Sequence, residues 1–123
     1  MLFAMLIYEK PSDFARRDSS GDGAAYVGAW RKYHAAIVEA GIFVSGSALD
    51  VPETATTVRM RDSKRQIQDG PYASAKEQLG GFTLLELPSL DAALEWAARS
   101  PAAAYGAVEV RPLASELDQH IQR

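Results

Sequence analysis

His34 is the first residue of this sequence whose type and position could do chemistry. It follows Trp30 by four residues and precedes Ile37 and Val38 by three and four, so these side chains share one face of a helix. That face is apolar and is expected to look toward a sheet. An imidazole held there is either a satisfied core group or a proton-transfer group in a cavity between helix and sheet. The second use requires a partner that sets its tautomer.

Asp69 is the acidic partner that the sequence offers to His34. It opens the run Asp69-Gly70-Pro71-Tyr72, which is followed at once by residues 73–81. Gly and Pro interrupt both helices and strands, so the run predicts a shaped surface loop, and its closing Gly80-Gly81 predict a tight entry into the next strand. An aspartate before Gly-Pro has two interpretations, which can coexist. It closes an Asx-turn through the backbone, or it presents a carboxylate to a substrate.

Three further side chains are predicted to bind a ligand. Tyr72 follows Pro71, which holds the ring in a defined direction, so that it walls a pocket or fills the barrel. Tyr33 is an amphipathic aromatic residue that lines the same cavity or packs in the core. Lys76 forms a solvated pair with Glu77 or neutralises an anionic ligand.

The composition argues against several functional classes. The 123 residues include no cysteine and two histidines, so disulfides, thiolate chemistry and a multi-histidine metal centre are not expected. The net charge is −3 and the basic residues are scattered, which argues against a nucleic-acid partner. The motifs for metal or dinucleotide binding do not occur, so we predict no cofactor. No signal peptide or membrane-length stretch is found, and a cytoplasmic protein with no membrane partner is expected.

Hydrophobic patterns predict the elements that position these residues. Strands are predicted at 2–8, 42–44, 82–87 and 107–111, and a hairpin with arms at 55–60 and 65–68. Helical spacing predicts one helix from residue 26 to Gly41, and another from a Ser89 cap to Pro101 with the apolar stripe Leu90, Ala93, Leu94 and Ala97. A short tail helix is predicted from Ser115. Residues 10–23 are expected to form a mobile surface loop.

The order of these elements predicts an α+β fold in a single domain, residues 1–123. It matches the split βαβ plan of a ferredoxin-like sheet with an inserted hairpin. Two helices cover one face of such a sheet, yet the strands at 2–8 and 82–87 are apolar on both faces. We therefore expect a homodimer through the second sheet face. The alternative is a monomer whose tail and long loop fold over that face.

The segments 69–72 and 76–81 resemble the signature of the YCII-related family, in its DGPF-motif subgroup. Matches at 55–59, 91–97 and 108–112 extend the resemblance over nearly the whole chain, although Tyr72 stands where phenylalanine is usual and residues 62–64 where a glycine-containing turn is common. The resemblance implies a dimeric α+β barrel of ferredoxin-like subunits. For the wider family it implies cofactor-free acid/base chemistry at a His/Asp pair. For the subgroup, it implies a genomic link to extracytoplasmic-function sigma factors.

Two functional hypotheses follow. In the first, His34 and Asp69 are the catalytic pair of a cofactor-free lyase or isomerase acting on a small polar metabolite, with Tyr72, Tyr33 and Lys76 as ligand-binding residues. In the second, the chain is a non-catalytic ligand-binding or regulatory module linked to sigma-factor signalling. Convergence of His34 and Asp69 on an open cavity favours the enzyme. If the two side chains lie far apart, the catalytic pair is excluded and a module that binds a protein partner is favoured.

Overall fold

A four-stranded antiparallel sheet forms the centre of the computed structural model, which describes residues 1–18 and 20–121. Its strands lie in the order β2-β5-β1-β6, with bounds Phe43–Ala48, Gln78–Glu86, Leu2–Glu9 and Ala107–Pro112 respectively. β1 is a central strand and pairs antiparallel with both β5 and β6. This order confirms the predicted ferredoxin-like α+β fold.

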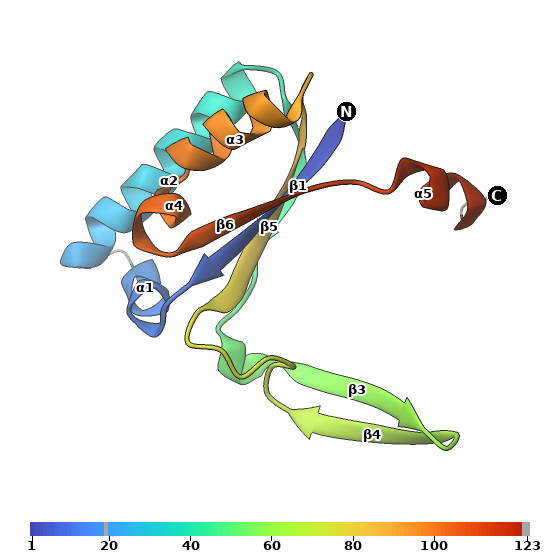
Figure 1. Cartoon of the computed structure of the whole chain (residues 1–123). Helices are drawn as coiled ribbons and strands as arrows, with labels where there is room; N and C mark the ends of the chain where they lie inside the picture. The colour runs from blue at the N-terminus through green and yellow to red at the C-terminus, as the bar shows by residue number, and fades with distance from the viewer. Residues whose placement is uncertain (19, 122–123) are drawn as a thin grey trace.

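Two helices, α2 (Asp22–Glu39) and α3 (Leu90–Arg99), cover one face of the sheet (Figure 1). Alternate residues of β1 point toward the helices, and Phe3, Met5 and Ile7 are buried there. The core that they form also includes Tyr33, Ile37, Leu85, Ala93 and Ala97. Burial of this shared apolar surface is the main force that holds the helices on the sheet.

The ends of both helices confirm the predicted caps. The Ser89 hydroxyl accepts a hydrogen bond from the Ala92 N–H at 3.2 Å, which caps α3. Gly41, with φ of 72°, follows the end of α2. α3 ends at Arg99, and Pro101 begins the short helix α4 (Pro101–Tyr105).

Three residues of the predicted apolar stripes are wrongly assigned to the core. Val38 and Leu90 are each 51% exposed and Leu94 is 49% exposed. In α3 the core contacts come from Ala93 and Ala97, which the predicted stripe also included, and from their partly buried neighbour Trp96. The two alanines let the helix backbone approach the sheet closely, which leaves the leucines on its outer flank.

Residues 10–23 are not the single loop that was predicted. They contain α1 (Pro11–Ala15), the 3-10 turn η1 (Arg16–Asp18) and the start of α2. The buried carboxylate of Asp13 accepts hydrogen bonds from the Lys10 N–H at 2.9 Å and from Arg16 at 2.8 Å. Polar composition suggested a loop, but these local side-chain bonds stabilise two turns of helix.

The predicted hairpin is confirmed, with strands β3 (Thr56–Arg61) and β4 (Lys64–Asp69). Asp62 and Ser63 form its turn with φ of 50° and 62°, as a two-residue type I′ connection requires. The 3-10 turn η2 (Pro52–Thr54) precedes it. β5 begins at Gln78, so Gly80 and Gly81 lie inside a strand and the loop after the hairpin is shorter than predicted.

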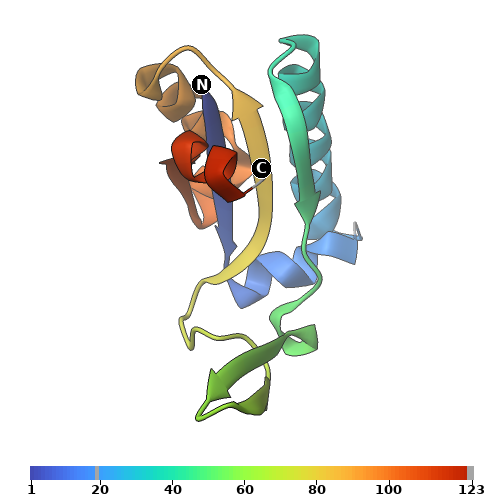
Figure 2. The same cartoon turned by 90° about the vertical axis from the view of Figure 1, so that its right-hand side faces the viewer.

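The second face of the sheet is not covered by any of the residues that the structure describes. Its apolar side chains on β1 and β5 are partly exposed: Leu2, Ala4, Leu6, Tyr8, Phe82 and Leu84. The hairpin and the tail helix α5 (Ser115–Ile121) both project to this side, away from the other helices (Figure 1). Figure 2 looks onto the uncovered face, with the hairpin below the sheet and α5 in front of it. The described chain therefore does not adopt the alternative in which the long loop and tail fold over this face.

None of the helices within residues 1–18 and 20–121 is both long and apolar enough to cross a lipid bilayer.

Candidate functional site

A cavity of about 640 Å³ lies between α2 and the sheet, under the β2 edge. Its walls are mainly aromatic and aliphatic, and include Tyr26, Trp30, Tyr33, Phe43 and Ile37. Its lining also includes the charged residues Glu9, Arg17 and Arg31, together with His34, Ser47 and Thr83. A cavity with apolar walls and a few convergent polar groups is the usual form of a small-molecule site. We call it the first cavity.

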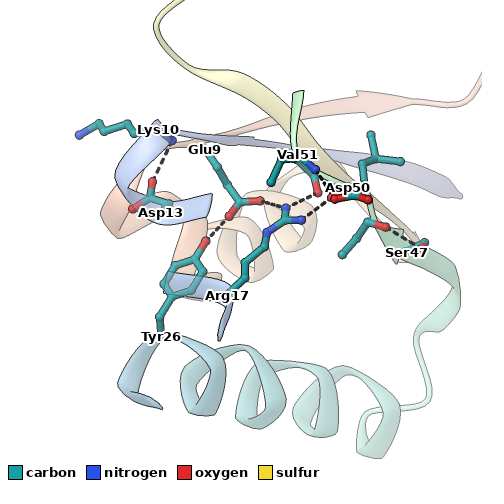
Figure 3. A network of polar contacts seen from close by, with 11 residues as sticks. Glu9, Lys10, Asp13, Arg17, Tyr26, Ser47, Asp50 and Val51 are labelled. Atoms are coloured by element: carbon teal, nitrogen blue, oxygen red, sulfur yellow. Dashed lines mark hydrogen bonds and ion pairs between the residues drawn. The ribbon is translucent and has the colours of Figure 1, made fainter. Parts of the chain in front are cut away.

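Glu9 is a buried carboxylate in the first cavity. It continues the alternation of Phe3, Met5 and Ile7 along β1, so it points to the helix-covered face and is 4% exposed. One carboxylate oxygen accepts a hydrogen bond from Arg17 at 2.7 Å, and the other accepts one from the Tyr26 hydroxyl at 2.5 Å. Figure 3 shows both side chains reaching the carboxylate from opposite sides. These charge-assisted bonds offset the cost of burying the charge.

Arg17 fixes this carboxylate and ties three segments together. Its guanidinium also donates to the Gly80 carbonyl at 3.0 Å and to the Leu49 carbonyl, so that β1, β5 and the segment after β2 meet at one side chain. The guanidinium lies over the Phe14 ring at 4.6 Å. Because η1 presents Arg17, the segment that composition described as a loop supplies the counter-charge of the site.

Both tyrosines of the cavity keep their protons. Burial, followed by the hydrogen bond to Glu9, raises the pKa of Tyr26 far above its ordinary value. Burial raises the pKa of Tyr33 to about 12. Tyr26 is therefore a stable donor to Glu9, whereas the Tyr33 hydroxyl donates to the Trp96 carbonyl at 2.8 Å and joins α2 to α3.

Gly80 is glycine because the Glu9–Arg17 pair occupies the place of a side chain. A Cβ at this position would overlap the Glu9 carboxylate and would lie 3.1 Å from the Arg17 guanidinium. The predicted strand entry at this glycine is wrong, since β5 begins at Gln78, and close packing against a buried ion pair is the reason for the missing side chain.

His34 lies on α2 at the edge of the first cavity. Its side chain is exposed, and its ring meets Phe43 edge-on with 5.0 Å between ring centroids. It is therefore not the satisfied core residue that one interpretation predicted. It has access both to solvent and to the cavity.

Asp69 lies in a second cavity of about 730 Å³, at the root of the hairpin. Its other polar lining residues are Glu53, Lys76 and Gln78, beside Pro11, Phe14 and Pro52. His34 does not line this second cavity, and no hydrogen bond joins the two side chains among the described residues. The chain does not bring the predicted pair together.

The predicted Asx-turn at Asp69 is wrong. Among the described residues no side-chain hydrogen bond to Asp69 is found, since Pro71, two positions on, has no N–H to donate. Gly70 holds the turn instead. With φ of 103° it donates to the Ala55 carbonyl at 2.7 Å, and its own carbonyl accepts from the Thr57 hydroxyl at 2.9 Å.

The three predicted ligand-binding residues lie in different places. Tyr33 lines the first cavity and Lys76 the second. Tyr72 is 74% exposed and fills neither pocket nor barrel; the Arg59 guanidinium lies over its ring at 5.0 Å.

The sequence analysis missed Glu9, Arg17 and Tyr26 as site residues. For Glu9 a signal existed, because an acidic residue that continues the buried alternation of a strand must be paired inside. Tyr26 was recognised for its helical spacing alone. For Arg17 no local pattern marks the contact, since its partners Leu49 and Gly80 lie 32 and 63 residues away. No cluster of three or more metal-ligating His, Asp or Glu side chains occurs within the described ranges.

Comparison with known proteins places this fold in a sequence family. Residues 1–116 match the YCII-related domain. An uncharacterised protein of Rhizobium meliloti (strain 1021) is 36% identical over 119 residues, which cover 93% of each chain. Among solved structures, 5-chloro-2-hydroxyhydroquinone dehydrochlorinase (TftG) from Burkholderia phenoliruptrix AC1100, in complex with 2,5-dihydroxybenzoquinone, is similar in fold. It superposes with a TM-score of 0.52 at 17% identity, over 92% of this chain and 93% of the other. The chain belongs to the YCII-related family.

Proposed function

We propose that the first cavity is the active site of a cofactor-free enzyme of the lyase or isomerase type that acts on a small polar metabolite. The observation that carries this proposal is the buried Glu9 carboxylate, held by Arg17 and Tyr26 at the wall of a mainly apolar cavity. A carboxylate fixed in this way is preorganised to accept a hydrogen bond from a bound molecule, because each of its oxygens has remaining acceptor capacity.

His34 is the proton-transfer group of this proposal. Imidazole is the side chain best suited to exchange protons near neutral pH, and His34 reaches both the cavity and solvent. It would take a proton from carbon beside a carbonyl, leaving an enolate. An isomerase returns that proton to another atom of the substrate, whereas a lyase lets a leaving group depart with its electron pair. Neither route needs an oxidant or a reductant.

The lining of the first cavity favours a hydroxylated ring as the substrate, whose keto tautomer supplies the carbon beside a carbonyl that the proposed step requires. Aromatic walls from Tyr26, Trp30 and Phe43 suit a planar molecule, and the carboxylate suits a hydroxyl donor. The Glu9–Arg17 pair is neutral as a whole, and Arg31 adds one positive charge to the lining. An enzyme with the same fold, the dehydrochlorinase TftG, is a lyase whose structure holds a dihydroxylated ring. This likeness is one of fold, so the cavity of this chain carries the proposal.

Binding of dihydroxylated rings to matched variants tests the site. Glu9→Gln should weaken binding by roughly tenfold to a hundredfold, since it replaces a charged acceptor by a neutral one. Glu53→Gln makes the same change in the second cavity and should leave the affinity unchanged. Isothermal titration calorimetry of a panel of such compounds measures both. Equal losses in the two variants, or no binding by any compound, would contradict the proposal.

We also propose that two copies associate through the uncovered sheet face. Leu6, Phe82 and Leu84 lie together there, in the centre of the sheet, and are partly exposed in the single chain. A contiguous apolar face of this kind on a central pair of strands favours association with a second, identical face.

Within the family we assign the chain to the DGPF-motif subgroup, on residues 69–81. The first part of that segment lines the second cavity and its last two residues line the first.

Leu84→Glu should convert the dimer into a monomer, because it buries an unpaired charge in the interface. The dissociation constant should rise by at least about a hundredfold. Leu94→Glu is the matched control, since Leu94 is half exposed on the opposite side of the sheet, on α3. Sedimentation equilibrium at micromolar protein measures both. A wild-type chain that sediments as a monomer would contradict the sheet-face dimer.

A further inference from the structure

The hairpin presents an apolar face that no described residue of its own chain covers. Val58 and Ile67 pair directly across the two strands, and Met60 lies on the same face two residues from Val58. Their side chains are 57%, 56% and 57% exposed. A two-stranded hairpin has little stability by itself in water, so this face requires a packing partner.

The tail helix α5 also presents an exposed apolar side. Leu117 and Ile121, one helical turn apart, are 57% and 69% exposed. The helix follows a segment that leaves the sheet beside the start of β1, where the Leu113 N–H donates to the Leu2 carbonyl at 3.0 Å. The hairpin joins the sheet at the other end of β1, where Glu9 pairs with Gln78. Both elements project to the uncovered side, at opposite ends of the strands (Figure 1).

We propose that α5 of one copy packs on the Val58–Met60–Ile67 face of the hairpin of a second copy, and reciprocally. The inference rests on the homodimer proposed above. When two uncovered faces meet about a two-fold axis that runs across the strands, the α5 end of each copy lies opposite the hairpin end of the other. Each contact then joins two exposed apolar surfaces, neither of which has a partner within residues 1–18 and 20–121 of its own chain.

The hairpin and α5 are opposite in charge. The hairpin carries four basic residues, Arg59, Arg61, Lys64 and Arg65, against the two acidic residues Asp62 and Asp69. Of the four, Arg65 is paired with Met60 and stands on the apolar face, whereas the others lie on the opposite face of the hairpin. α5 carries Glu116 and Asp118 in its first turn. Opposite charges beside matched apolar patches favour this pairing over hairpin against hairpin or helix against helix.

Disulfide cross-linking tests the contact directly, because the natural chain has no cysteine. A tagged Val58→Cys chain is mixed with an untagged Leu117→Cys chain under reducing conditions and then oxidised. We expect a mixed-disulfide dimer, identified by its mass. Gln66→Cys places the thiol on the opposite face of the same hairpin and should give at least about tenfold less mixed product with Leu117→Cys. All three positions are exposed, so the variants should fold.

The outcomes separate this inference from the dimer itself. Preferential cross-linking from Val58→Cys, repeated with Ile67→Cys, supports the exchange of α5. A dimer by sedimentation that cross-links equally from positions 58 and 66 overturns the α5–hairpin contact and leaves the sheet-face dimer standing. A monomer overturns both.

Discussion

Replacing Glu9 with alanine is expected to lower the free energy of unfolding by about 3 kcal/mol, since it removes one partner of a buried ion pair. Arg17 would lose its carboxylate and the Tyr26 hydroxyl would lose its acceptor, both inside the protein. This value is the lower end of the range for removing one partner of a buried ion pair. It applies here because the Arg17 side chain is 27% exposed, so water partly solvates the charge that is left. Urea denaturation followed by circular dichroism measures the change.

Glu86→Ala is the matched control for Glu9→Ala. Glu86 makes an ion pair of the same length, 2.7 Å, with the N-terminal amine, but the two partners are 58% and 63% exposed. Water screens this pair, so its loss should cost less than about 1 kcal/mol. Equal effects of the two substitutions would show that burial does not govern the Glu9 interaction, and would remove the argument that this carboxylate is preorganised.

His34→Gln is expected to lower kcat of the proposed reaction by about 10²- to 10⁴-fold, the range for loss of a general acid or base. The melting temperature should stay unchanged, because His34 is exposed and its replacement leaves no buried group unpaired. Stopped or continuous assays with a ring compound that binds the first cavity supply kcat and KM separately. A small change in KM with a large change in kcat identifies proton transfer rather than binding.

Asp69→Asn distinguishes the present site from the originally predicted His34–Asp69 pair. Asp69 lies in the second cavity, so this variant should retain wild-type kcat. A loss as large as that of His34→Gln would mean that the two residues act together in the assembled protein. Unchanged turnover in His34→Gln itself would instead favour the ligand-binding module over the enzyme.

The fold was largely predictable because its signals are local. Strand β1 and the helix caps at Gly41 and Ser89 follow from side-chain periodicity and from residues with special backbone or capping properties. The hairpin follows from two alternating arms with a short polar turn. These patterns need no knowledge of distant residues. The prediction of a loop at residues 10–23 failed because composition alone does not show that Asp13 is buried. The hydrogen bonds of its carboxylate stabilise α1.

The candidate site was predictable only in part. The sequence by itself predicted that His34 shares a helix face with core residues such as Ile37, and that the chain would form a ferredoxin-like sheet whose second face its two helices do not cover. The tertiary structure decided that Glu9, and not Asp69, shares the cavity with His34. It also decided that Arg17 reaches Gly80, 63 residues away, to complete the pair. Periodicity specifies which face of an element a side chain occupies, but the packing of whole elements determines which faces meet, and only that packing brings distant charges into one cavity.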